Sequence, residues 1–133
     1  MKLTTRSEYG LLALVYLARR RGEGFVSVET IATAQEIPPK FLEQIMLALK
    51  RARYVRSQKG QHGGYSLAKP PDEISLAEVI RLFDGALAPT ESVSQYFYES
   101  TPIEREAGLV RILTEVRDWV SQKLESTTIA DVC

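Results

Sequence analysis

A short glycine-rich hairpin is the feature that most narrows the folds open to this chain. In residues 53–68, RYVRSQKGQHGGYSLA, apolar Val55, Tyr65 and Leu67 alternate with polar neighbours, as two paired strands with one packed face require. The glycines between the strands permit the backbone angles of a narrow turn. The sequence therefore predicts a β-ribbon with a basic tip.

Two helices joined by a turn are predicted before this ribbon. Ser27 is a typical N-cap for the segment SVETIATAQEIP, and Pro38-Pro39 can begin the next helix, PKFLEQIMLALKRA, because a proline in the first turn loses no internal hydrogen bond. Helix, turn, helix and then basic hairpin is the order of a winged helix-turn-helix, which places one helix in the DNA major groove. The third helix is expected to bury Leu42, Ile45 and Leu49 and to leave polar side chains on its opposite face.

The whole chain is predicted to be mainly α, with a winged helix-turn-helix domain, a small β-ribbon wing and a long C-terminal dimerisation helix. Capping-box patterns at Thr5/Glu8 and Ser75/Glu78 indicate two further helix starts. We expect four parts: the DNA-binding domain (1–85), a loop and candidate sensor region (86–103), the dimerisation helix (104–125) and a C-terminal tail (126–133).

An apolar stripe on the last helix needs a partner. Its members recur at helical spacing and are Leu109, Ile112, Leu113, Val116, Trp119 and Val120. Two partners are open: the same domain, which would make this an ordinary core helix, or the twin helix of a second subunit. The dimer is favoured because helix-turn-helix proteins commonly contact two half-sites with two-fold symmetry.

The charges are divided between the two halves of a chain whose net charge is zero. Residues 1–71 hold 12 Lys and Arg against 5 Asp and Glu, whereas residues 72–133 hold 5 against 12, so the halves carry +7 and −7. The basic half coincides with the helix-turn-helix pattern, which favours contact with a polyanion over a merely solvated surface.

Four segments carry a resemblance to a known family. MKLTTRSEYGLLAL, IPPKFLEQI, VRSQKGQHGGYSLA and STTIADV are similar, in order and spacing, to the Rrf-type family of bacterial winged-helix transcription regulators (IscR- and CymR-like). The resemblance implies a homodimer that binds an imperfect palindrome in double-stranded DNA and often represses transcription. It also implies that Lys40, Glu43 and Gln44 face bases or nearby phosphates, and that Lys59 stands where the family has a wing arginine.

The candidate DNA-contacting residues come from the N-terminus, the two helices and the wing. They are Lys2, Arg6, Ser27, Pro39, Lys40, Glu43, Gln44, Arg51, Lys59, Gly60, Gln61, His62 and Gly63. Lysine lacks the planar guanidinium fork of arginine, so we expect Lys59 to contribute charge more than base recognition. His62, isolated among glycines, is expected to contact phosphate or nothing.

The resemblance also places the cluster ligands of iron–sulfur relatives at Ser92, Tyr98, Glu104 and Ala107 of this chain. None is a cysteine, and iron–sulfur clusters are held mainly by Cys thiolates. We therefore expect no cluster, metal or other cofactor. The loop sequence GALAPTESV is similar to the cluster-free, CymR-like branch, which implies a small-molecule or protein effector instead.

Other classes of function fit this sequence less well. One His and one terminal Cys offer no nucleophile and base, so the chain is not expected to be an enzyme. A winged-helix protein-interaction module is the alternative reading of the fold, but the basic half argues against it. Lacking a signal peptide and an apolar run of membrane length, the chain is expected to be cytoplasmic, without membrane contact.

Overall fold

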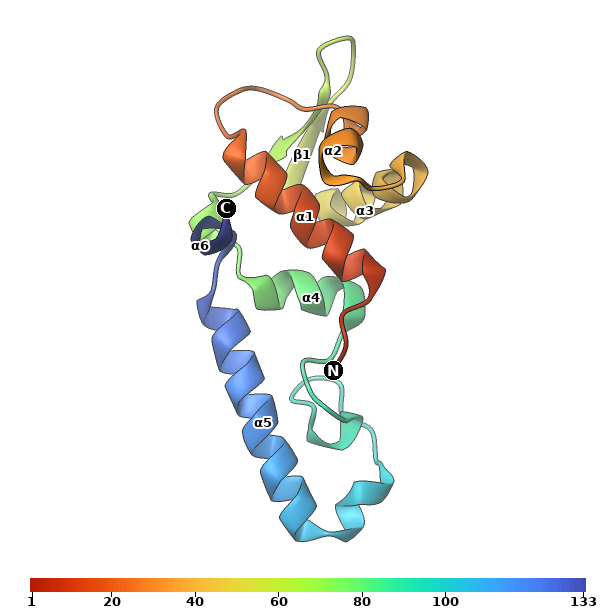
Figure 1. Ribbon diagram of the computed structural model, residues 1–133, viewed down its shortest axis with the longest axis vertical. Coiled ribbons are helices and arrows are strands. Elements are labelled where there is room, and N and C mark those ends of the chain that lie inside the picture. Colours follow the sequence, from red (N-terminus) through yellow and green to blue (C-terminus); the bar gives the residue numbers. More distant parts are fainter.

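The computed structural model describes residues 1–133 as an upright molecule with the wing at one end and a long helix at the other (Figure 1). The helices are α1 (Thr5–Arg19), α2 (Val28–Gln35), α3 (Pro39–Arg51), α4 (Leu76–Asp84), α5 (Ala107–Ser126) and α6 (Ile129–Val132). Strands β1 (Val55–Gln58) and β2 (Gly64–Leu67) form the ribbon, and single 3-10 turns span Pro71–Glu73, Glu91–Val93 and Pro102–Arg105. The predicted mainly α fold with a small β-ribbon is confirmed. None of the helices combines the length and apolar character that a membrane crossing needs.

One main core holds the winged domain together. Fully buried side chains from α1, α2 and α3 meet there, among them Leu14, Ile31 and Leu42. Leu12, two residues before Leu14 in α1, is 38% exposed, so the buried face of this helix runs through Leu14. A smaller cluster under α4 contains Ala77, Ile80 and Leu87 and receives Leu124 from α5.

The helix ends follow the predicted capping patterns in two of three cases. The Ser27 hydroxyl accepts the Thr30 N–H at the start of α2, and Ser75 and Glu78 form a reciprocal capping box at the start of α4. The box predicted at Thr5 is wrong. The N-cap of α1 is Thr4, whose backbone N–H and hydroxyl bond to the Asp84 carboxylate at the end of α4. This tertiary contact replaces the local one.

The ribbon pairs Val55 with Leu67 and Gln58 with Gly64, in antiparallel register. Val26, in the link between α1 and α2, forms an isolated β-bridge with Tyr65 through backbone hydrogen bonds of 2.7 and 2.8 Å. Gly64 makes this approach possible, because a Cβ there would lie 2.2 Å from the Val26 carbonyl oxygen. The glycine pair thus serves strand packing as well as the turn.

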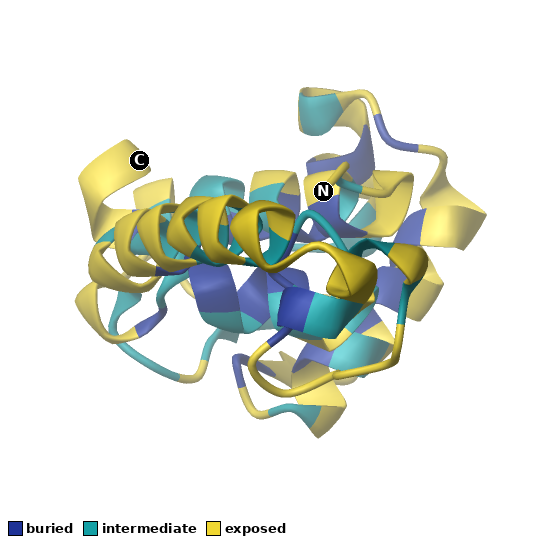
Figure 2. Ribbon diagram, turned by 90° about the horizontal axis from the view of Figure 1, so that it is seen from below, coloured by how far each residue is buried: buried dark blue, intermediate teal, exposed yellow.

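Helix α5 begins three residues later than predicted and ends one residue beyond the predicted range. Pro102 starts a 3-10 turn instead, and Glu106 has extended backbone angles, so regular helix is possible only from Ala107. The helix lies along the edge of the molecule, and only Ser121 on it is buried. Figure 2 shows this helix as mostly exposed, with the buried residues behind it.

The predicted C-terminal tail is not a tail. Residues 126–133 contain α6, and the side chain of Ile129 is completely buried in the main core. Two backbone hydrogen bonds of 2.9 Å, from Leu76 to Thr127 and from Ile129 to Ile74, tie the segment to the start of α4. Thr128 and Asp131 form a capping box, a signal that the sequence contained.

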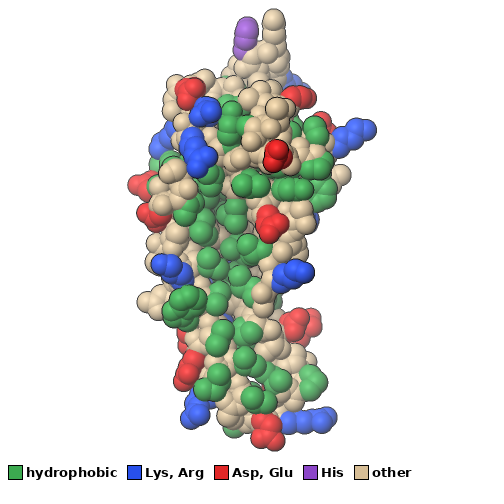
Figure 3. Space-filling model, viewed as in Figure 1, with side chains coloured by type: hydrophobic (Ala, Val, Ile, Leu, Met, Phe, Trp, Pro, Cys, Tyr) green, Lys and Arg blue, Asp and Glu red, His purple; other side chains and the backbone are tan.

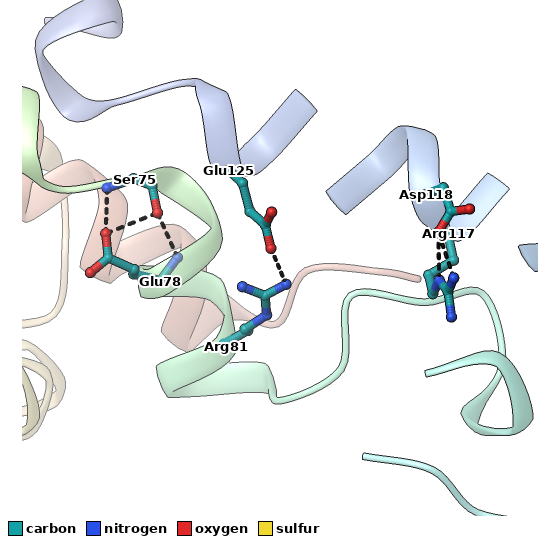
Figure 4. A network of polar contacts seen from close by, with 6 residues as sticks. All are labelled: Ser75, Glu78, Arg81, Arg117, Asp118 and Glu125. Carbon is teal, nitrogen blue, oxygen red and sulfur yellow. Dashed lines mark hydrogen bonds and ion pairs between the residues drawn. The ribbon is translucent and has the colours of Figure 1, made fainter. Parts of the chain in front are cut away.

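Polar contacts connect α5 to the winged domain (Figure 4). Arg81 of α4 forms an ion pair of 2.6 Å with Glu125, and Arg117 donates to the Val93 carbonyl in the preceding loop.

The capping box of α4 shifts two pKa values. Burial alone would raise the pKa of Glu78, but hydrogen bonds from Ser75 and Tyr54, together with the charge of Lys69, lower it below its ordinary value. Burial, with the negative charge of Glu78, raises the pKa of its partner Tyr54 to about 12.

Candidate nucleic-acid interface

The turn between α2 and α3 sets the angle at which α3 projects. Glu36 adopts the left-handed conformation that ends α2, and the N–H of Ile37 donates to the Ala32 carbonyl oxygen at 2.9 Å. The side chain of Ile37 is buried in the main core, which fixes the turn to the domain. Pro39 then occupies the first turn of α3, as predicted.

Helix α3 divides cleanly into a buried and an exposed face. Leu42, Ile45, Met46 and Leu49 are completely buried. The opposite face exposes Lys40, Glu43, Gln44 and Arg51, the polar candidates expected from the sequence, together with the apolar Leu47. No carboxylate pairs with Lys40 or Arg51, because both ion pairs in the structure involve other residues. This face is long, polar and free, as a helix in the major groove must be.

The wing tip projects beyond the helices at one end of the molecule (Figures 1 and 3). Lys59, Gly60, Gln61 and His62 are exposed, and the tip is closed by a hydrogen bond of 3.1 Å from the Gly63 N–H to the Gly60 carbonyl. A Cβ at Gly63 would lie 2.1 Å from the Gln58 carbonyl oxygen, so this turn requires glycine. The geometry carries Lys59 and His62 clear of the domain surface.

The exposed face of α3 lies close to the base of the wing. Burial raises the pKa of the Tyr65 hydroxyl in β2, and the negative charge of Glu43 raises it further. Helix α3 also contacts strand β1 directly, so the helix and the ribbon are adjacent in the fold.

Three other candidates lie apart from this surface or have another role. Lys2 borders a hollow that it shares with Asp84 and Glu91 near the start of the chain, away from α3 and the wing. Arg6 lies over the ring of Phe83 in α4, with its guanidinium carbon 5.4 Å from the ring centroid. The Ser27 hydroxyl is engaged in its cap. Their contact with DNA stays a prediction, as do the individual roles on α3 and the wing.

Arg56, an exposed cation of β1, was not among the candidate residues named from the sequence. Its Nε donates to Ser66 Oγ at 3.1 Å, and its guanidinium carbon lies 5.7 Å from the Phe25 ring centroid. The signal was available, because Arg56 follows the buried Val55 and strand alternation turns it outward.

The predicted dimerisation residues lie on a bare apolar face. Leu109, Ile112, Val116 and Trp119 are between 42% and 69% exposed, and Leu113 and Val120 are half-buried. Figure 3 shows apolar side chains forming a band down this side of the molecule, from the winged domain to the far end of α5. The most exposed side chains of the stripe therefore do not pack against the rest of the same chain.

The residues at the implied cluster positions do not fit an iron–sulfur cluster. The hydroxyl of Ser92 hydrogen-bonds to that of Thr101 at 2.5 Å, and the hydroxyl of Tyr98 donates to the Glu104 carboxylate. That hydrogen bond raises the pKa of Tyr98 and lowers that of Glu104. Cys133, the single thiol, lies at the opposite end of α5 from this loop and is exposed.

A helix-turn-helix followed by a two-stranded wing, with a free polar face on its second helix, defines the winged helix-turn-helix class of DNA-binding transcription regulators. The comparisons with known proteins agree. Residues 3–133 match the Rrf2 family model, described as an iron-dependent transcriptional regulator, and the chain belongs to this family.

Curated relatives extend over nearly the full chain. The HTH-type transcriptional regulator CymR of Bacillus subtilis is 34% identical over 132 residues, covering 99% of this chain and 89% of that protein. A putative HTH-type transcriptional regulator of Mycobacterium tuberculosis is 40% identical over 136 residues, covering 99% and 81%. These relatives are regulators of transcription, a non-enzymatic function, as predicted.

Solved structures share the same fold. The structure of CymR, the global cysteine regulator of B. subtilis, matches with a TM-score of 0.80 at 32% identity, covering 99% of this chain and 95% of that one. The IscR of T. potens matches with a TM-score of 0.76 at 30% identity, covering 99% and 85%. The predicted resemblance to IscR- and CymR-like regulators is confirmed.

Proposed function

We propose that this DNA-binding regulator acts as a cytoplasmic homodimer that represses transcription from a palindromic operator, without an iron–sulfur cluster. The main support for this proposal is that one chain has two free faces: the polar face of α3 and the apolar face of α5. The first suits a single half-site of DNA, and the second suits a second copy. Two copies related by a two-fold axis would present two α3 helices to two half-sites.

The exposed stripe on α5 supports the dimer energetically. Each large apolar side chain removed from water contributes on the order of 1.5–3 kcal/mol. Leu109, Ile112, Val116 and Trp119 together would offset much of the entropy lost on association. Repression follows physically if the dimer covers a promoter, because the bound protein and the polymerase would compete for the same DNA.

The loop 86–103 is proposed as the sensor region for a small-molecule or protein effector. It joins α4 to α5, so a ligand bound there could change how α5 is placed relative to the winged domain. Exposed Tyr96, Phe97 and Tyr98 lie in it, and Arg81 of α4 lies over the Tyr96 ring at 5.1 Å from its centroid. Leu87 and Val93 anchor the loop by burial, whereas the three aromatic side chains are exposed, so they are the part of the loop that an effector would meet.

The test is selection of bound fragments from a random pool of duplex DNA, followed by sequencing. We expect an enriched inverted repeat and, by sedimentation, two chains on each selected duplex. In transcription reactions, an operator that overlaps the promoter should lower transcript yield. Fragments without a common sequence would contradict the proposal and favour a protein-interaction module, and one chain on an unrepeated site would contradict the dimer.

The absence of a cluster has its own test. Protein purified without oxygen should be colourless and free of iron and sulfide, because the residues at the implied ligand positions offer no thiolate. Stoichiometric iron and sulfide with visible charge-transfer absorption would overturn this part alone. The dimer and the operator would stand on their own measurements.

A further inference from the structure

A basic hollow lies at the junction of three segments: the end of α1, the link from α1 to α2, and the base of the ribbon. Its volume is about 480 Å³, within the range of small-molecule sites. Four cationic side chains border it: Arg20, Arg21, Arg56 and Lys69. No Asp or Glu is among the residues that line it.

Three of these cations are held in place by neighbouring aromatic rings. The Arg20 guanidinium carbon lies 4.7 Å from the Tyr16 ring centroid, and Lys69 Nζ lies 5.2 Å from that of Tyr54. Arg56 lies over Phe25 and donates to Ser66 Oγ. None of them forms an ion pair, since both ion pairs of the structure involve residues of α5 and other arginines. The charges are therefore ordered but not neutralised.

Two glycines shape the wall of the hollow. Gly22 and Gly24 line it, and both have positive φ, of 88° and 86°, which suits the tight link between α1 and Val26.

The negative groups nearby are weaker or engaged elsewhere. The C-terminal end of α1 carries a partial charge of roughly half an electron, against four full positive charges. The Glu78 carboxylate lies near Lys69 but accepts hydrogen bonds from Ser75 and Tyr54. Glu23 is exposed in the link and does not line the hollow.

The hollow lies on the side of the winged domain away from α3. Figure 1 shows the end of α1 and the start of the link on one side of the ribbon, and α2 and α3 on the other. A duplex in contact with α3 would leave the hollow open to solvent. Its four cations would therefore be available to a second ligand.

We propose that this hollow binds a small anion that carries at least two negative charges on phosphate or carboxylate groups. Arginine forks match both groups geometrically. A ligand there would connect the end of α1 to strand β1 through Arg20 and Arg56 and so restrain the wing. This regulatory consequence rests on the proposed DNA-binding role, whereas the binding itself does not.

The experiment is isothermal titration of the full-length, DNA-free protein with pyrophosphate and, separately, with citrate, at constant ionic strength. We expect saturable binding of at least one anion with one site per chain; the tighter of the two identifies the favoured group. The double substitution R20Q/R56Q should weaken binding by at least about tenfold, because charge-assisted hydrogen bonds are removed. Lys69→Gln, as an independent variant, should weaken it in the same direction.

Arg19→Gln is the matched control. It removes the same charge from the same turn of α1, but Arg19 borders a different hollow with Glu8 and Gln35, so its affinity should stay within about twofold of wild type. Thermal unfolding of each variant checks that it is folded.

Three results would overturn the proposal: no saturable binding of either anion, unchanged binding by R20Q/R56Q, or equal weakening with Arg19→Gln. A flanking DNA phosphate is the other source of such a group. This source is tested with an operator extended by about ten base pairs, one helical turn, on each side. If neither anion binds and R20Q/R56Q loses affinity only for this longer operator, the hollow is a DNA contact. Failure to find an operator would leave the anion titration unaffected.

Discussion

Helices α3 and α5 are both amphipathic, yet the molecule uses their faces in opposite ways. In α3, four large apolar side chains are completely buried and the polar face is free. In α5, a helix of 20 residues, only Ser121 is buried and the apolar face is free. The free face of each helix indicates its partner: a polar, cationic face suits DNA, and an apolar face suits protein.

This difference arises from the position of each helix and not from its composition. Helix α3 is surrounded by α1, α2 and the ribbon, which cover its stripe. Helix α5 contacts α4 and the preceding loop through Leu124, which packs into the small cluster under α4, through the Arg81–Glu125 ion pair and through Arg117. An exposed apolar face such as that of α5 rarely stays bare on a single protein. Substitutions that act on one helix and not on the other test whether the two free faces have different partners.

The largest effect is expected from Val116→Asp on α5. In a two-fold interface, this substitution would bury an unpaired charge near its mirror image, which typically costs about 3–5 kcal/mol, or about 100-fold or more in association. The variant should sediment as a monomer and lose operator affinity far more than affinity for an isolated half-site. Gln122→Asp, on an exposed part of the same helix, should stay dimeric.

A Val116→Asp variant that remains dimeric would show that the subunits meet elsewhere. If it unfolds completely at the denaturant concentration where dimers normally dissociate, α5 belongs to the domain core instead. Either outcome would remove the contrast between the two helices.

Ile129→Ala should damage the fold of the winged domain itself. The side chain is completely buried, and removing a core side chain of this size costs about 2–5 kcal/mol. Urea unfolding in the monomeric Val116→Asp background isolates this effect from dimerisation. Val132→Ala, 44% exposed in the same short helix, should change stability by less than about 0.5 kcal/mol. Equal, small effects would mean that α6 is not part of the core.

Gln44→Ala tests whether the free face of α3 contacts bases. A glutamine amide can bond two ways to an adenine edge, so its removal should relax preference at one base pair in each half-site, at about 1–3 kcal/mol. Competition between operators that differ at single positions measures this. A uniform weakening across all sequences would instead place Gln44 on the phosphate backbone.

Lys59→Ala tests whether the wing acts by charge alone. We expect similar weakening for operator and random duplexes, and a salt dependence flatter by about one unit for each phosphate that the lysine no longer neutralises. Lys123→Ala, an exposed lysine on α5, should leave both unchanged. If only the operator is affected, Lys59 contributes to sequence recognition and the expectation from its missing guanidinium is wrong.

The smallest effect concerns pH and the capping box of α4. Because the pKa of Glu78 is lowered in the folded state, its contribution to stability is present above its ordinary pKa of 4.5 and disappears as the pH falls through the lower folded value. Glu78→Gln should therefore remove about 1 kcal/mol or less near neutral pH, and progressively less as the pH falls through the lowered folded-state pKa of Glu78. Glu73→Gln, exposed and without a side-chain hydrogen bond, should show no such dependence, as measured by urea unfolding across pH.

Local chemistry was sufficient to predict the elements of the winged domain. The caps at Ser27 and Ser75, the proline start of α3 and the glycine turn of the wing depend on residues within a few positions of one another. Strand alternation and helical spacing likewise identified the exposed face of α3. These features survive in the fold because tertiary contacts reinforce them.

Long-range contacts decided the rest. Thr4, the N-cap residue of α1, is held by the carboxylate of Asp84, 80 positions away, and Ile129 enters the core through backbone pairing with Ile74. The basic hollow joins Arg20 and Lys69 because Val26 pairs with Tyr65. The sequence by itself determined which residues form helices, strands and caps, because those preferences are local. Only the tertiary structure decided which apolar face is covered and which cations converge, because burial depends on segments distant in the chain.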